Sequence, residues 1–217
     1  MRLGLFSRPR RGQPAIALIY IKSQNAHDNS MKIISYIASP RKEGNTAWVV
    51  NKILEAAKEQ RAETQSFYCG ELNINPCKGC LGCLKSDKCV INDDMQMLYA
   101  ELKQADALIL GSPVYMGQMT AQAKTFTDRL FAHITPRFSP HYKEGNAGKK
   151  LILVFTQGNP DASKFQIYYD YTKTMFQLLE FDVKDVVIVT GMRTGSAHEQ
   201  KGLHSSLIDV GKSLVAG

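Results

Sequence analysis

Apolar residues follow two alternating patterns along this chain from Met31 onward. Short runs rich in isoleucine, leucine and valine are typical of buried strands, and apolar residues three and four positions apart are typical of helices. The runs predict strands at 33–37, 64–68, 107–110, 151–156 and 186–190. The helical pattern covers 46–60, 95–105, 121–134, 164–181 and 199–215, with Asn92 as the expected cap of the second helix. Strict alternation of strand and helix predicts an α/β fold, a parallel sheet with helices on both faces.

The first thirty residues do not share this pattern. They begin with the arginine-rich, acid-poor stretch MRLGLFSRPRRGQ and continue into the seven-residue apolar run AIALIYI. We favour a segment contributed by an upstream start codon or an expression vector, ahead of a targeting presequence and of an extra strand built by AIALIYI. No small-residue cleavage pattern follows the run, which argues against a secretory signal. We therefore expect residues 1–30 to be an extension outside the core and residues 31–217 to form one domain.

Composition and charge narrow the class of protein. With 44% hydrophobic and 22% charged residues the chain has a globular composition. No apolar run approaches the roughly 20 residues that cross a bilayer, so we expect a soluble, cytoplasmic protein without membrane partners. The formal net charge of +7 suggests nucleic-acid binding, but the first thirty residues carry +4 of it and the remainder has no basic block. The charge pattern therefore argues against nucleic acid as a partner.

Unusual loops follow three of the expected strands. The first strand ends in ASPRKEGNTA, the third in GSPVYMGQMTA and the fourth in TQGNPDA. In a parallel sheet with helices on both faces, ligands bind outside the carboxyl ends of the strands. The three loops therefore mark the expected binding edge.

The first loop has the features of an anion cradle. Ser39, Asn45 and Thr46 supply hydroxyl and amide donors, Gly44 allows close approach of the backbone, and Arg41 adds positive charge. The helix that begins at the end of this loop favours a phosphate at its N-terminus. An ordinary capped turn is the open alternative. A Gly-x-Gly-x-x-Gly dinucleotide motif is absent from the loop.

The other two loops offer a surface for a planar ring. The third loop forms an apolar lip from Pro113, Val114, Tyr115, Met116 and Gly117. The fourth loop brings side-chain and backbone donors from Thr156, Gln157 and Gly158 to the same edge. Ordinary packing of Tyr115 is the alternative to ring stacking. Phosphate donors at one strand exit and a ring-sized surface at the next two describe a mononucleotide with a planar ring.

Four of the five cysteines lie within PCKGCLGCLKSDKC, residues 76–89. The spacing C-x2-C-x2-C-x5-C of Cys77, Cys80, Cys83 and Cys89 is similar to iron–sulfur ligand runs, because such clusters take four thiolates. Structural zinc sites usually join two separated knuckles, and disulfides need an oxidising compartment. We favour a cluster over empty or redox-active thiols, and zinc least. Cys69 is expected to be a small buried apolar residue.

Three motifs in order carry a family resemblance: SPRKEGNT at 39–46, CKGCLGCLKSDKCVINDDM at 77–95 and SPVYMGQMTAQAKTFTDR at 112–129. The chain resembles the flavodoxin-fold NAD(P)H-dependent FMN reductases, specifically their iron–sulfur flavoprotein branch. The resemblance implies a flavodoxin-like three-layer sandwich whose five-stranded parallel sheet has the order 2-1-3-4-5. It implies FMN, with its phosphate at 39–46 and its ring against 113–117 and 156–158. It also implies a [4Fe–4S] cluster on the four cysteines near the flavin, and a homodimer or homotetramer.

The expected function is an FMN-dependent oxidoreductase in which the flavin carries the chemistry and no side chain acts as a general acid or base. With a cluster, single electrons would pass between FMN and a ferredoxin-type or small-molecule partner. Without a cluster, NAD(P)H becomes the favoured donor, and the alternative is a metal-free NAD(P)H-dependent FMN or quinone reductase. A non-enzymatic flavin electron carrier or redox sensor is the third reading.

Overall fold

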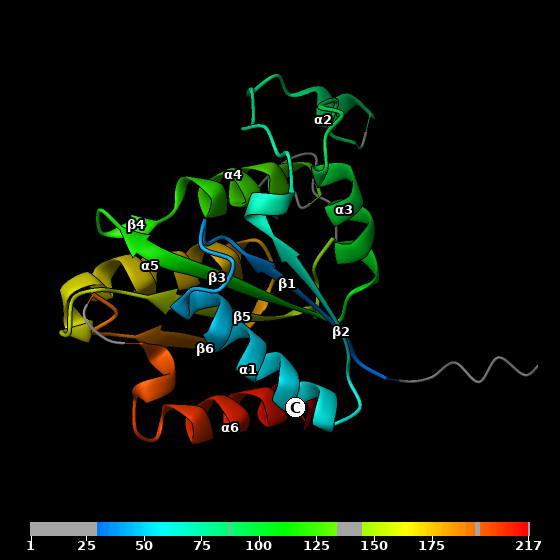
Figure 1. Ribbon diagram of the computed structural model, residues 1–217. Coiled ribbons are helices and arrows are strands. Elements are labelled where there is room, and N and C mark those ends of the chain that lie inside the picture. Colours follow the sequence, from blue (N-terminus) through cyan, green and yellow to red (C-terminus); the bar gives the residue numbers. More distant parts are fainter. Residues whose placement is uncertain (1–29, 87, 134–144, 194–195, 217) are drawn as a thin grey trace, which may run out of the picture.

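The computed structural model describes residues 30–86, 88–133, 145–193 and 196–216. Five parallel strands form the sheet in the order β2-β1-β3-β5-β6, which confirms the expected 2-1-3-4-5 order (Figure 1). Their bounds are Lys32–Ile37 for β1, Glu63–Tyr68 for β2, Ala107–Tyr115 for β3, Lys150–Thr156 for β5 and Asp182–Val189 for β6. A short antiparallel strand, β4 (Gln118–Met119), pairs with the end of β3 and was not predicted. The expected extension at residues 1–30 lies, except for Ser30, outside the described residues.

Helices cover both faces of the sheet (Figure 1). Helices α1 (Asn45–Glu59) and α6 (Leu203–Ala216) pack on one face, and α3 (Met95–Gln104), α4 (Ala121–Arg129) and α5 (Gln166–Leu178) pack on the other. Strand β1 shows why, since Ile33 and Ile37 are buried in the core on the side of α1 and α6, while Ile34 and Tyr36 are buried in the core on the opposite side. A strand buried on both faces reads as a continuous apolar run, which is how the sequence identified it.

Two glycines set the close packing of α1. An added Cβ on Gly211 of α6 would lie 2.4 Å from the Ile53 carbonyl oxygen, and one on Gly111 of β3 would lie 2.6 Å from Val50 Cγ2. Neither position has room for a side chain. Helix α1 therefore lies directly against α6 on one side and β3 on the other, and its N-terminus is held at the carboxyl edge of the sheet.

Several helix ends differ from the expected ones. The helix expected at 121–134 is α-helical to Arg129 and continues as a 3-10 turn to Ala132. The helices expected at 164–181 and 199–215 both begin later, at Gln166 and Leu203, because 3-10 turns precede them. Periodicity alone does not separate a 3-10 turn from the α-helix beside it.

The expected cap of α3 was wrong. Asp94 occupies the N-cap position, and it is the Asp93 carboxylate that accepts the Met95 N–H at 3.2 Å. Asn92 is exposed and lies one residue before this turn. Among the described residues, no helix has the length and apolar character to cross a membrane.

Candidate cofactor cleft and cysteine lobe

A cleft of about 430 Å³ opens at the carboxyl edge of the sheet. It gathers ten of the thirteen residues that the sequence singled out as cofactor contacts. Its lining is Ser39, Arg41, Gly44, Asn45, Thr46, Pro113, Val114, Tyr115, Thr156, Gly158, Met192 and Arg193. The three expected loops therefore meet at the carboxyl edge of the sheet, as the strand order predicted. A fourth segment, residues 192–193, was not expected.

The first segment leads into the N-terminus of α1. Gly44 is the N-cap residue, and no side-chain hydrogen bond caps the helix there. The backbone N–H groups of the first turn are therefore available to an acceptor in the cleft. Ser39 Oγ accepts the Arg41 N–H at 3.2 Å, which folds the loop back on itself. An added Cβ on Gly44 would lie 3.0 Å from Arg41 Cβ, so the tight loop has little room for a larger residue.

Buried hydroxyl groups join this segment to the others. The Thr46 and Thr156 Oγ1 atoms are 2.6 Å apart and link α1 to the end of β5. Asn45 Oδ1 accepts the Ala197 N–H at 3.0 Å, which connects α1 to the 3-10 turn after β6. Thr120 Oγ1 donates to the Ala38 carbonyl at 2.7 Å and so joins the start of α4 to the end of β1. The cleft is thus held by uncharged hydrogen bonds between different strand exits.

A two-residue turn connects β3 to β4 beside the cleft. Tyr115 pairs with Gln118, and between them Met116 and Gly117 have φ values of 51° and 82°. Two successive left-handed residues are typical of the type I′ hairpin turn. Met116 is fully exposed at the tip, and neither turn residue is part of the cleft lining.

The third expected residue outside the lining is Gln157. Its side chain is buried, and its amide donates to the carbonyl oxygens of Asn159 and Asp161 at 2.9 and 2.8 Å. Its Oε1 accepts a hydrogen bond from the Tyr169 hydroxyl. Burial raises the pKa of Tyr169 to about 12, with the neighbouring Tyr168 adding to the effect, so the phenol is protonated. Gln157 therefore stabilises the loop after β5 through these hydrogen bonds and does not line the cleft.

Two lining residues, Met192 and Arg193, were not expected. They follow β6 in a turn that begins at Gly191, whose φ is 76°. An added Cβ on Gly158 would lie 3.3 Å from Arg193 Cβ, so the two loops are in contact. The signal was present in the sequence: the glycines in TGMRTG follow the fifth expected strand, whose carboxyl end lies at the same edge.

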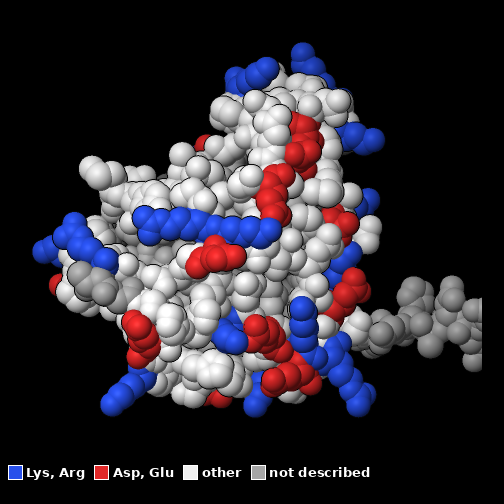
Figure 2. Space-filling model, in the orientation of Figure 1, with Lys and Arg blue, Asp and Glu red and all other residues white. Residues whose placement is uncertain are grey.

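The four clustered cysteines lie in a separate lobe, residues 76–86 and 88–92, at the top of Figure 1. This cysteine lobe contains the short helix α2 (Gly82–Ser86) and sits over α3 and α4. Figure 2 shows basic side chains at its outer end, and Lys78, Lys85 and Lys88 of this segment are exposed. All four cysteines line one cavity of about 100 Å³, which we call the cysteine cavity.

The walls of the cysteine cavity are largely apolar. They comprise Cys77, Lys78, Gly79, Cys80, Leu81, Cys83, Cys89, Val90, Ile91, Asp128, Arg129, Phe131 and Ala132. Within the described ranges, no three His, Cys, Asp or Glu side chains are grouped closely enough to hold a single metal ion. Cys69 lies elsewhere, as expected: it is buried, and its thiol donates to the Ser39 carbonyl at 3.2 Å. Burial raises the pKa of this thiol.

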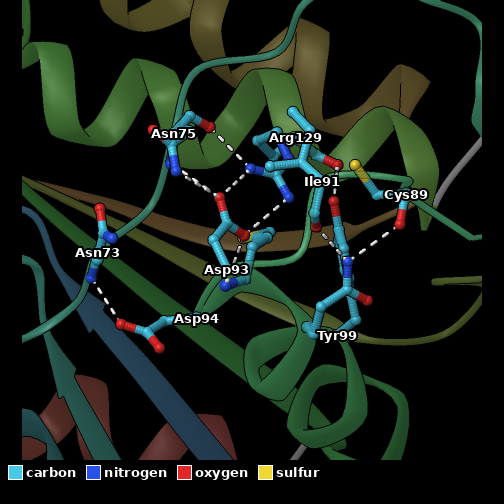
Figure 3. Close-up of polar contacts among 10 residues, drawn as sticks. Asn73, Asn75, Cys89, Ile91, Asp93, Asp94, Tyr99 and Arg129 are labelled. Carbon is cyan, nitrogen blue, oxygen red and sulfur yellow. Dashed lines mark hydrogen bonds and ion pairs between the residues drawn. The ribbon is translucent and has the colours of Figure 1, made fainter.

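Hydrogen bonds close the neck of the cysteine lobe (Figure 3). The Asn73 N–H donates to the Asp94 carboxylate at 2.6 Å, and the Asp94 N–H donates to the Asn73 carbonyl at 3.2 Å. Closer to the lobe, the Asn75 N–H donates to Asp93 Oδ2 at 2.8 Å, and Arg129 forms an ion pair with the same carboxylate at 2.7 Å. Burial alone would raise the pKa of Asp93, but the hydrogen bonds from Arg129 and Asn75 outweigh it and lower the pKa to about 2.

The chain matches the family model of NADPH-dependent FMN reductase over residues 31–203. It belongs to this family. The match begins where the alternating pattern begins, and it spans both the cleft and the cysteine lobe.

Among its relatives, this FMN reductase family member is similar to named iron–sulfur flavoproteins. An iron–sulfur flavoprotein of Methanocaldococcus jannaschii is 43% identical over 99 residues, covering 46% of this chain and 51% of the relative. One of Methanosarcina thermophila is 41% identical over 117 residues, covering 54% and 61%. The matching segment thus spans about half to three fifths of these relatives' length.

Solved structures share the fold of this family member at low identity. The NAD(P)H:quinone oxidoreductase from Methanothermobacter marburgensis gives a TM-score of 0.66 at 15% identity, covering 85% of this chain and 97% of that one. An FMN-dependent NADH-azoreductase from Bacillus anthracis, solved in complex with FMN, gives 0.64 at 13% identity, covering 85% and 99%. These likenesses confirm the flavodoxin-like architecture.

Proposed function

We propose that this chain is an FMN-dependent oxidoreductase that passes electrons from a reduced donor to an acceptor. The observation that carries the proposal is the cleft, because it brings together ten of the thirteen residues expected to contact a mononucleotide. Membership of the FMN reductase family supports FMN as its occupant. When bound, FMN supplies hydride and single-electron chemistry at its ring, and the protein supplies position and electrostatics.

The end of the cleft formed by residues 39–46 suits the phosphate. The first turn of α1 offers uncapped N–H groups, and the helix dipole favours an anion there. Arg41 adds a positive charge at the same end, and Arg193, from the loop after β6, is a second basic residue of the lining and lies next to Gly158. The described lining contains no carboxylate, so the cleft does not repel a negatively charged ligand.

The remaining walls suit the ring. Pro113, Val114 and Tyr115 form an apolar side, and Thr156 and Gly158 form a side with hydroxyl and backbone donors. Tyr115 is about half exposed at 46%, so its ring is available to a ligand. No side chain in the described lining is a carboxylate or a histidine, which supports a reaction carried by the cofactor without a protein acid or base.

We further propose that Cys77, Cys80, Cys83 and Cys89 hold a [4Fe–4S] cluster. They fit the group because all four face one largely apolar cavity, and clusters of this type take four thiolates. A cluster spreads its ligands over several iron atoms, so it does not require three of them to converge on one point. The relatives named iron–sulfur flavoproteins support this assignment. The partner would then be a ferredoxin-type or small-molecule electron carrier, and the assembly a homodimer or homotetramer.

A metal-free NAD(P)H-dependent FMN or quinone reductase is the second candidate. One observation favours it: Cys77 and Cys80 are exposed to solvent, as redox-active thiols usually are. In that case the four cysteines remain thiols, and NAD(P)H is the donor.

An absorption spectrum of protein purified without oxygen tests both candidates. Flavin bands together with a broad iron–sulfur shoulder, and FMN as the only flavin released by heat, are the expected results. Full flavin with no iron after reconstitution with iron and sulfide would favour the metal-free reductase. Release of FAD, or no flavin after reconstitution, would overturn the FMN proposal.

A further inference from the structure

Arg129 is the largest side chain in the described core that is fully buried, with 1% of its surface exposed. It is the last residue of α4 and lies beneath the cysteine lobe. Burying a guanidinium is costly unless its charge is paired and its donors are used. The position of this residue therefore requires an explanation from its surroundings.

Part of the explanation is the ion pair with Asp93. Arg129 Nη1 and Nη2 donate to the two Asp93 carboxylate oxygens at 2.7 and 3.0 Å, a bidentate arrangement (Figure 3). Nη1 also donates to the Asn75 carbonyl at 2.7 Å. Both partners are 1% exposed. These bonds fix the guanidinium plane.

These hydrogen bonds leave one nitrogen of the guanidinium without a partner. Arg129 Nε is buried and has no hydrogen-bond partner within the described ranges. The same side chain lines the cysteine cavity together with all four cysteines. Closing the neck of the lobe needs only the Nη atoms, so it does not account for a buried, unpaired N–H donor on a residue that lines the cysteine cavity.

We propose that Arg129 is a positioning residue for the four-cysteine centre: anchored by Asp93, its guanidinium supplies a fixed positive charge and a free N–H donor to the cysteine cavity. This inference rests on the proposed cluster. Four thiolates give such a centre a negative charge, and its reduction potential depends on nearby charge and on hydrogen bonds to sulfur. Lys78, Lys85 and Lys88 of the lobe are exposed to solvent, where their charge is screened, although Lys78 also lines the cavity. Arg129 is the buried cation of the described cavity lining.

A role limited to closing the neck makes a different prediction. Replacing either partner of the ion pair breaks the same contact, so both replacements would change a structural readout in the same direction. If Arg129 acts through its charge, the two replacements should shift the reduction potential in opposite directions. One-electron reduction adds one negative charge to the centre, so loss of the Arg129 cation disfavours reduction and loss of the Asp93 anion favours it.

The test compares Arg129→Met and Asp93→Asn with the full-length wild type, all purified without oxygen and reconstituted with iron and sulfide. Iron and acid-labile sulfide per FMN are measured, and the cluster potential is obtained by spectroelectrochemical titration. We expect Arg129→Met to shift the potential to more negative values and Asp93→Asn to shift it to more positive values. Both should lower iron retention, with FMN content unchanged.

Two further variants complete the design. Arg129→Lys keeps the buried charge, so its cluster potential should lie closer to the wild-type value than that of Arg129→Met. If Arg129→Met and Asp93→Asn fail to fold, the potential of Arg129→Lys is compared with that of the wild type alone. Lys124→Met removes an exposed cation from the same helix and should shift nothing. Shifts of the same sign in Arg129→Met and Asp93→Asn, or a wild-type potential in Arg129→Met or an unrestored one in Arg129→Lys, would overturn the inference. Wild-type protein that holds FMN but no iron would instead overturn the proposed cluster.

Discussion

The cleft and the cysteine cavity are built in opposite ways. The cleft takes its lining from four strand exits, and uncharged hydrogen bonds such as that between Thr46 and Thr156 hold those exits together. The cysteine cavity takes its four thiols from one local segment, and a buried ion pair closes the segment at its base. The cleft is therefore a property of the sheet, whereas the cysteine cavity depends on a few contacts at one neck. Changes at one region should leave the other intact.

The largest expected effect separates the two regions by metal content. Replacing any one of Cys77, Cys80, Cys83 or Cys89 by serine should remove a ligand of the same centre. Iron content and cluster absorption should then fall together, while FMN stays bound because its lining shares no residue with the cysteine cavity. Iron analysis and a visible spectrum of anaerobic preparations measure this. Cys69→Ser is the matched control and should change neither, and a single cluster is ruled out if one of the four variants keeps full iron.

The reverse experiment damages the cleft alone. In Gly111→Ala the new Cβ would lie 2.6 Å from Val50 Cγ2 and 3.2 Å from Thr46 Cγ2, so α1 must move away from β3. Overpacking of this kind costs roughly 1–3 kcal/mol of unfolding free energy. We expect weaker FMN binding, by fluorescence titration, with unchanged iron per chain. Gly70→Ala, where the added Cβ meets no atom within 4 Å, is the control. Equal loss of iron and FMN would show that the two regions are coupled.

Charge at the phosphate end gives the next effect. Thr46→Glu places a carboxylate where the proposed phosphate binds, and repulsion adds to the loss of one hydrogen bond, which is about 1 kcal/mol. FMN affinity should therefore fall by more than tenfold. Thr46→Val removes only the hydroxyl, so FMN affinity should fall less in this variant. The difference between the two variants separates the effect of charge from that of the hydrogen bond. Equal affinities in wild type and Thr46→Glu would place the phosphate elsewhere.

Acid should weaken the neck of the lobe. The Asp93 pKa of about 2 lies below its ordinary 3.8, so the stabilisation is complete above about pH 4 and is lost as the pH falls toward 2. By linkage the contribution is on the order of 2 kcal/mol. Urea unfolding at pH 5, 4 and 3 should show a steeper loss for wild type than for Asp93→Asn. Parallel losses in the two proteins would mean that Asp93 titrates normally.

The smallest expected effect is at the hairpin beside the cleft. Met116 has a φ of 51°, which costs a residue with a Cβ roughly 1–2 kcal/mol, and asparagine tolerates this region better. We expect Met116→Asn to stabilise the chain by about 0.5–1 kcal/mol, measured by thermal unfolding, with iron content unchanged. Destabilisation would indicate that the exposed Met116 side chain makes contacts in the assembled protein.

Apolar runs predicted the five parallel strands, though not all of their bounds, and hence the edge where the cleft lies, because a strand buried on both faces has a continuous apolar sequence. They did not predict β4, since Met116-Gly117 is not a common hairpin dipeptide and two residues are too few for a pattern. Arg129 was also missed. In KTFTDR it looks like a solvent-facing helix residue, and only the tertiary contact with Asp93, 36 residues away, explains its burial.

The closed neck of the cysteine lobe also bears on ancestry. Because Asn73 and Asp94 are already hydrogen-bonded neighbours, the chain between them leaves and rejoins the fold at one place and can be gained or lost as one segment. Loss of this segment would remove Asp93 and leave the buried Arg129 charge without its partner. A relative that lacks the segment should therefore also lack this arginine. Such a relative would have a short turn in place of residues 73–94 and an apolar residue in place of Arg129.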